Sequence, residues 1–114
     1  MEARRAIELF AAVASHYGVG WTPSGSSKFG ADALRVDGKI FAALTRKHRL
    51  LLKLPPARVA QLLADGRAER FASGGRAMNG WITVTPQQAS EWMPLANEAR
   101  AFVAAETRRK PRKR

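Results

Sequence analysis

Three short strand patterns follow one another between residues 33 and 54, and no helical pattern separates them. The first, residues 33–36, ends at Asp37 and Gly38, a dipeptide typical of a two-residue hairpin turn. The second and third, residues 39–45 and 49–54, are separated by the charged tripeptide Arg46-Lys47-His48. Since strands joined by such short connections run antiparallel, this part of the chain predicts an antiparallel sheet.

Helical patterns lie on both sides of these strands. Apolar residues recur every three or four positions from Glu2 to about Tyr17, and Gly18 ends that pattern. A second helix is predicted from Pro56 to the Asp-Gly pair at 65–66, and two further strands at 68–71 and 81–84. The sequence thus predicts an α+β fold, an antiparallel sheet of about four to five strands with helices packed on it.

The last helix has two candidate starting points. Thr85 followed by Pro86 and Gln88 matches a capping box, with Thr85 as the N-cap. Pro94 would then fall well inside the helix, which favours a second start capped by Ser90. We therefore expect the helix to begin at Ser90, with Pro94 near its first turn.

The composition restricts the class of protein. The 114 residues contain no Cys, which excludes disulfides, thiolate metal sites and cysteine nucleophiles. Apolar residues make up 46% of the chain, enough for one core, but no run is long enough for a membrane span or a secretory leader. We expect a cytoplasmic protein with a single domain at residues 1–106 and a disordered basic tail at 107–114.

Positive charge is concentrated in two places. The chain carries 20 Lys and Arg against 9 Asp and Glu, for a net charge of +11. The tail holds Arg108, Arg109, Lys110, Arg112, Lys113 and Arg114, and the turn between the second and third strands holds Arg46, Lys47 and Arg49. These nine residues are the candidate contacts to nucleic-acid phosphates.

The sequence gives little evidence of metal binding, catalysis or small-molecule binding. The two histidines, His16 and His48, have no second ligand at metal-binding spacing, and no nucleophile motif is present, so we expect no metal, no cofactor and no enzymatic activity. The glycine-rich segment at 74–81 contains Arg76, Met78 and Trp81. These three residues either line a groove or seat the tryptophan in the core.

Four sequence stretches occur in an order that resembles a known family. They are VDGKIFAAL at 36–44, LLLKLPPARVAQLLADGRAERF at 50–71, GRAMNGW at 75–81 and WMPLANEARAFV at 92–103. Together, over residues 28–103, they resemble the MmcQ/YjbR-like proteins and the related TfoX N-terminal-like domains. The resemblance implies a secretion-chaperone-like α+β fold and a DNA-binding label, but no catalytic residues.

Three functions follow as expectations. The first is non-catalytic, low-specificity binding of DNA or RNA through phosphate contacts. The alternative is a protein-interaction or chaperone-like module without a nucleic-acid role, and small-molecule binding is third. No membrane partner is expected, and the sequence leaves the oligomeric state open.

Overall fold

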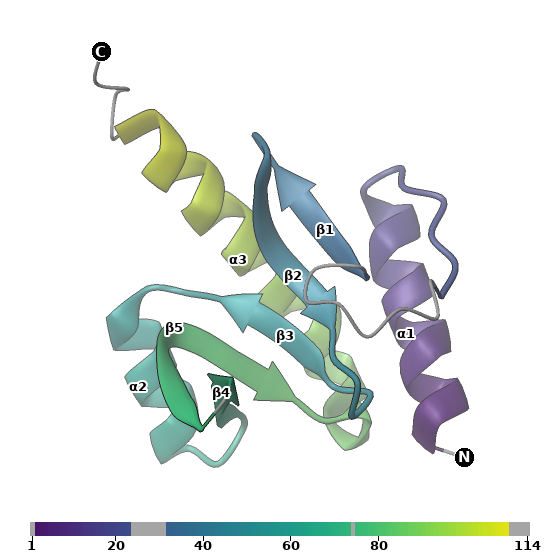
Figure 1. The fold of residues 1–114 in the computed structure, drawn as a ribbon, viewed down its shortest axis with the longest axis horizontal. Coiled ribbons are helices and arrows are strands. Elements are labelled where there is room, and N and C mark those ends of the chain that lie inside the picture. The colour runs from purple at the N-terminus through teal and green to yellow at the C-terminus, as the bar shows by residue number, and fades with distance from the viewer. Residues whose placement is uncertain (1, 24–31, 74, 110–114) are drawn as a thin grey trace.

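The computed structural model describes residues 2–23, 32–73 and 75–109. Helix α1 (Glu2–His16) precedes strands β1 (Ala33–Val36), β2 (Lys39–Leu44) and β3 (Leu50–Lys53). Helix α2 (Pro56–Ala64), strands β4 (Glu69–Ser73) and β5 (Arg76–Val84), a 3₁₀ turn η1 (Pro86–Gln88) and helix α3 (Ala89–Arg109) complete the chain (Figure 1). The predicted α+β class is confirmed, and β1 and α2 lie within a residue of the predicted bounds.

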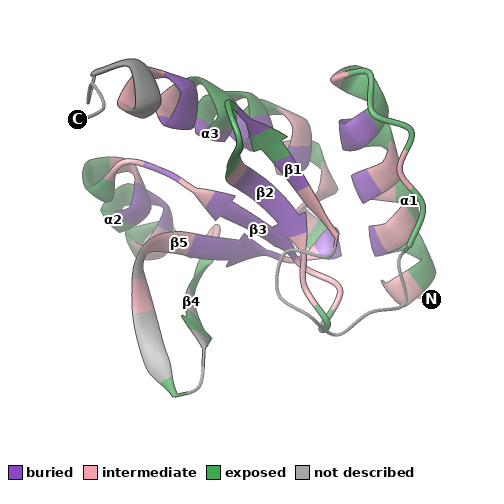
Figure 2. Cartoon of the chain, turned by 45° about the horizontal axis from the view of Figure 1, so that its top comes forward, coloured by how far each residue is buried: buried purple, intermediate pink, exposed green. Residues whose placement is uncertain are grey.

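The five strands form one antiparallel sheet in the order β1-β2-β3-β5-β4. Alternation along β3 divides its residues between the two faces of the sheet. Leu50, Leu52 and Leu54 join the main core, whereas Leu51 is buried outside that cluster. Strands β1, β2 and β5 and the three helices supply the rest of the core, and Figure 2 shows the buried residues of α1 and α3 turned toward the sheet.

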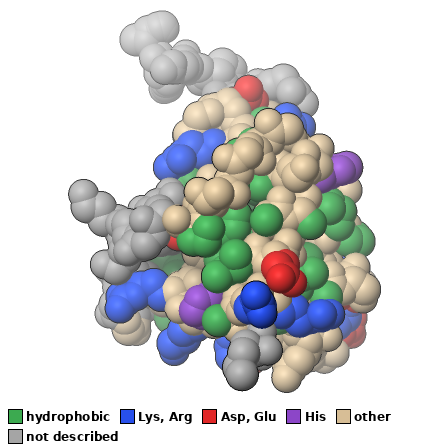
Figure 3. Space-filling view, turned by 90° about the vertical axis from the view of Figure 1, so that its right-hand side faces the viewer, with side chains coloured by type: hydrophobic (Ala, Val, Ile, Leu, Met, Phe, Trp, Pro, Cys, Tyr) green, Lys and Arg blue, Asp and Glu red, His purple; other side chains and the backbone are tan. Residues whose placement is uncertain are grey.

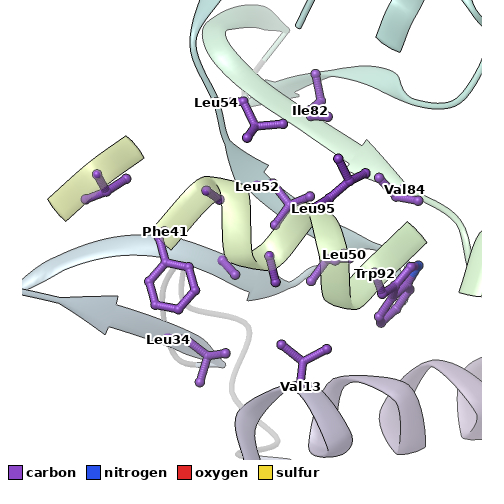
Figure 4. Close-up of a cluster of buried hydrophobic side chains, with 14 of the residues drawn as sticks. Val13, Leu34, Phe41, Leu50, Leu52, Leu54, Ile82, Val84, Trp92 and Leu95 are labelled. Atoms are coloured by element: carbon purple, nitrogen blue, oxygen red, sulfur yellow. The ribbon is translucent and has the colours of Figure 1, made fainter. Parts of the chain in front are cut away.

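A β-bulge in β2 changes which residues face this core. Leu34 is paired with Ala42, but the next residue of β1, Arg35, is paired with Ile40. Phe41 is therefore the extra residue of the pair, and a bulge lets consecutive side chains fall on one side of a strand. Phe41 and Ala42 are both fully buried in the main core, and Figure 4 shows Phe41 beside Leu34. Strict alternation along β2 would place Ile40 on the same face as Ala42, but Ile40 is only half-buried.

A larger irregularity occurs in β5. The pairing with β4 moves from Arg70↔Ile82 to Ala72↔Ala77, so one residue of β4 lies opposite four residues of β5. Gly80 lies in this bulge with a φ of +86°, and its carbonyl accepts a hydrogen bond of 3.0 Å from the Leu54 amide. Glycine adopts this left-handed conformation without a steric cost. Residues 76–80, which lie between the two strands predicted at 68–71 and 81–84, belong to strand β5.

The start and end of α3 also differ from expectation. The helix begins at Ala89, so Ser90 lies inside it, and Thr85 makes no side-chain capping bond. Pro94 lies within the second turn at an exposed position. Ser90 is exposed as well, so water can hydrogen-bond to the carbonyl that Pro94 leaves without a donor. At the other end the helix continues to Arg109, beyond the expected domain boundary at 106.

The two ends of the undescribed segment 24–31 are held together by Trp21 and Asp32. The Trp21 indole N–H donates to a carboxylate oxygen of Asp32 at 3.1 Å, and the Leu44 amide donates to the Asp32 carbonyl at 2.9 Å. The Trp21 ring also packs edge-on against Phe10 of α1, with centroids 4.7 Å apart. These contacts join α1, β1 and β2 at one point.

Candidate nucleic-acid interface

The turn between β2 and β3 is built around Thr45. The Thr45 amide donates to the Arg49 carbonyl at 2.9 Å, and the Arg49 amide donates to the Thr45 hydroxyl at 3.1 Å. His48 has a positive φ of 64° and donates its amide to the Thr45 carbonyl. This network fixes the backbone and leaves Arg46 and Lys47 exposed at the turn.

The three predicted cations of this turn differ in whether they have an ion-pair partner. Among the described residues, neither Arg46 nor Lys47 has an ion-pair partner. Arg49 instead donates from Nη1 to Oε1 of Glu69 at 2.6 Å, across β5. Its side chain is 35% exposed, so the ion pair remains in contact with solvent. The turn thus presents two uncompensated cations, and the third is neutralised by Glu69.

Many acidic side chains of the described chain are also used in ion pairs with nearby cations. Arg58 makes a bidentate pair with Glu98 of α3, with distances of 2.8 and 3.0 Å. Arg67 lies 2.8 Å from Glu91, and this hydrogen bond raises the pKa of the Arg67 guanidinium above its usual value. Such pairs join the helices and connections to one another. They leave the excess positive charge on residues outside the pairs, such as Arg46 and Lys47.

The structure places the β2–β3 turn and the end of α3, from which the predicted basic tail continues, on different sides of the molecule. Lys53, at the end of β3, lies 3.6 Å from Glu106 near the end of α3, whereas the Arg46–Arg49 turn precedes β3. Figure 1 shows the end of α3 and the β2–β3 turn on opposite sides of the molecule. The backbone of Arg108 and Arg109 is helical, and Lys110, Arg112, Lys113 and Arg114 lie outside the described residues.

The candidate groove residues lie along β5. Arg76 begins the strand, and Met78 is half-buried within the bulge. Trp81 is the last residue of the bulge, pairs with Lys53 across the sheet and has the Lys53 ammonium 5.9 Å from its ring centroid. Trp81 is therefore a half-buried residue of the sheet and lies outside the main core cluster. Whether these residues bind a ligand stays a prediction.

Sequence reasoning missed a cluster around Tyr17. Its hydroxyl donates to the side-chain oxygen of Asn97, its ring packs edge-on against Phe41, and Arg100 lies 5.6 Å from the ring centroid. Burial raises the pKa of the Tyr17 phenol, and the charge of Arg100 partly opposes that rise. No local pattern announces the cluster, because Tyr17 and Asn97 are 80 positions apart.

The two histidines lie in separate parts of the fold. His16 ends α1 and His48 lies in the β2–β3 turn. In the described ranges, no group of three His, Asp or Glu residues could hold a metal ion. Within the same ranges, no helix has the length and apolar character required to cross a membrane.

The region from β2 through most of α3 is also the region that matches a known family. Residues 38–101, more than half of the chain, match the model of the Luciferase domain. The chain belongs to the Luciferase domain family. The matched range of this Luciferase domain contains the β2–β3 turn and the β5 bulge, and it excludes α1 and the C-terminal cations. No curated protein and no solved structure matches the chain.

Proposed function

We propose that this Luciferase-domain chain is a non-catalytic protein that binds DNA or RNA through phosphate contacts, with low sequence specificity. The observation that carries the proposal is the exposed pair Arg46 and Lys47, which has no ion-pair partner in the described chain. Figure 3 supports it, with Lys and Arg side chains gathered along the lower part of the face shown. Cations that meet phosphates release condensed counterions, which favours binding without reading bases.

The same surroundings argue against base recognition at this turn. Reading single-stranded bases requires exposed aromatic rings on which bases stack. The aromatic residue of β2, Phe41, is 1% exposed, and Trp92 at the start of α3 is equally buried. Apart from the half-buried imidazole of His48, the turn offers a guanidinium and an ammonium group, both of which suit a phosphate backbone.

Reversing both charges in Arg46→Glu/Lys47→Glu is expected to weaken nucleic-acid binding roughly tenfold at physiological salt. The slope of log affinity against log salt should also become shallower by about 2 units, since each phosphate contact contributes about 0.9. The measurement is fluorescence anisotropy with labelled duplex DNA, single-stranded DNA and RNA, titrated at several salt concentrations.

The matched control is Arg70→Glu/Arg100→Glu, which changes the net charge equally at two exposed positions outside the turn, on β4 and α3. If the control weakens binding as much as the turn variant, only overall charge matters and the turn is no interface. If the unaltered chain shows no binding near physiological salt, the proposed function is wrong.

The Arg49–Glu69 pair provides a gain-of-function test at the same surface. Glu69→Gln removes the charge that compensates Arg49, and both side chains are partly exposed, so little stability should be lost. A third cation then becomes available at the turn. We expect tighter binding and a salt slope steeper by about 1 unit in the same anisotropy assay. An unchanged slope would show that Arg49 lies outside the contact surface.

A second candidate function is small-molecule binding, and the matched Luciferase domain is the observation that favours it. Met78 and Trp81 at the β5 bulge are the residues we would assign to it.

We also propose a closer affiliation with the MmcQ/YjbR-like proteins, because the resemblance over residues 28–103 overlaps the matched range. A cytoplasmic location is proposed with it. If neither nucleic acids nor small molecules bind, a protein-interaction role is the next hypothesis to test.

A further inference from the structure

The start of helix α1 lies at the same end of the molecule as the β2–β3 turn. Tyr17, which directly follows α1, contacts Asn97 well inside α3, whereas α1 itself contacts the 3₁₀ turn η1 that precedes α3. The first turns of α1 are therefore directed toward the start of α3. Figures 1 and 2 agree with this direction and place the N-terminus on the side of the β2–β3 turn.

The 3₁₀ turn η1 is the neighbour that the two elements share. Val84, the last residue of β5, pairs with Leu50, the first residue of β3, and η1 begins two residues later at Pro86. The β2–β3 turn ends directly before Leu50. The start of α1 and the turn are thus held on a common support of packed secondary structure.

Two arginines of α1 are exposed at this end. Arg5 has no ion-pair partner in the described chain. Arg4 lies 3.9 Å from Glu8, and the two side chains are 83% and 72% exposed. An ion pair that exposed contributes little, so Arg4 can exchange Glu8 for a phosphate at little cost. The side chain of Glu2, the other acid of these turns, lies outside what the structure describes.

The cations of the two elements gather on one surface. Figure 3 shows Lys and Arg side chains along the lower part of the molecule, the part in which Figure 1 places both the start of α1 and the β2–β3 turn. A duplex presents its phosphates in fixed positions, so it loses little freedom when it meets cations that packed elements also hold in place. Such a surface suits a duplex better than a flexible single strand.

We propose that Arg4 and Arg5 of α1 belong to the same phosphate-binding surface as Arg46 and Lys47, so that one nucleic-acid duplex contacts the helix and the turn together. The inference rests on the proposed function and adds α1 to its interface. Residues 38–101, which match the family, contain only the turn. The complete surface thus includes a helix outside the matched range.

The test is anisotropy of a labelled ten-base-pair duplex, about one helical turn long, at several salt concentrations. We expect Arg4→Glu/Arg5→Glu to weaken binding roughly tenfold at physiological salt and to make the salt slope shallower by about 2 units. Combination with Arg46→Glu/Lys47→Glu should lower the slope by about 4 units in total. The control Arg70→Glu/Arg100→Glu should change binding much less.

Two further measurements separate a lost contact from an altered helix. Acidic residues are favourable near the start of a helix, so the circular dichroism of Arg4→Glu/Arg5→Glu should match that of the unaltered chain. Glu8→Gln leaves both arginines in place and removes the acid beside Arg4. We expect this variant to bind the duplex about twofold more tightly. Unchanged affinity in Glu8→Gln would contradict a role for Arg4.

The remaining outcomes distinguish the inference from the proposed function. If Arg4→Glu/Arg5→Glu binds like the control while Arg46→Glu/Lys47→Glu binds weakly, α1 is outside the interface and the proposed function stands. If a single strand of the same length binds as tightly as the duplex, the assignment of a duplex is wrong. If the unaltered chain binds neither, the proposed function fails, and the inference fails with it.

Discussion

Replacement of Trp92 by alanine is expected to lower the free energy of unfolding by about 3–5 kcal/mol. The side chain is 1% exposed and belongs to the core shared by the helices and the sheet (Figure 4). Its indole N–H also donates to the Thr85 carbonyl at 3.0 Å, which connects the first turn of α3 to the end of β5. The alanine variant therefore loses both buried volume and the partner of a backbone carbonyl.

Urea denaturation followed by circular dichroism measures this loss. Trp92→Phe keeps one aromatic ring but removes the N–H together with part of the buried ring volume, so it should cost less than the alanine variant, about 1–3 kcal/mol. Met93→Ala, at a half-buried neighbouring position, serves as the matched control and should cost less than Trp92→Ala. Equal losses at positions 92 and 93 would contradict the orientation of α3.

The second large effect is expected at Phe41. Phe41→Ala should cost about 3–5 kcal/mol of unfolding free energy, because the ring is 1% exposed and packs against Tyr17 with centroids 5.4 Å apart. The adjacent Ile40→Ala should cost clearly less, since Ile40 is only half-buried. Strict alternation along β2 predicts the opposite order. The comparison of the two variants in the same denaturation assay therefore tests the bulge directly.

The elements that short-range chemistry determines were predictable from the sequence. The turn at residues 37–38 and Pro56 at the start of α2 have local signatures, and both elements occur where they were expected. The bulges were not predictable, because an extra residue in one strand is defined only by its partner strand. The predicted start of β5 at residue 81 was wrong for that reason. The start of α3 at Ala89 was missed because the 3₁₀ turn before it replaces the expected cap.

The candidate interface was predictable in part. Local sequence identifies Arg46 and Lys47 as turn residues, and the structure leaves them exposed. The pairing of Arg49 with Glu69, 20 positions away, depends on the order of β3, β5 and β4 as neighbours in the sheet. The separation of this turn from the end of α3 likewise depends on how α3 lies relative to the sheet. The positions of charged residues along the sequence reveal neither the Arg49–Glu69 pair nor the separation of the turn from the end of α3.

The contacts of Trp21 and Asp32 have a consequence for how this chain tolerates change in length. They fix the two ends of the segment 24–31 against α1 and β2, so the strand register does not depend on the number of residues between them. Doubling the length of a flexible connection costs only about 0.6 kcal/mol in closure entropy. This segment is therefore a natural place to insert a peptide tag or fluorophore.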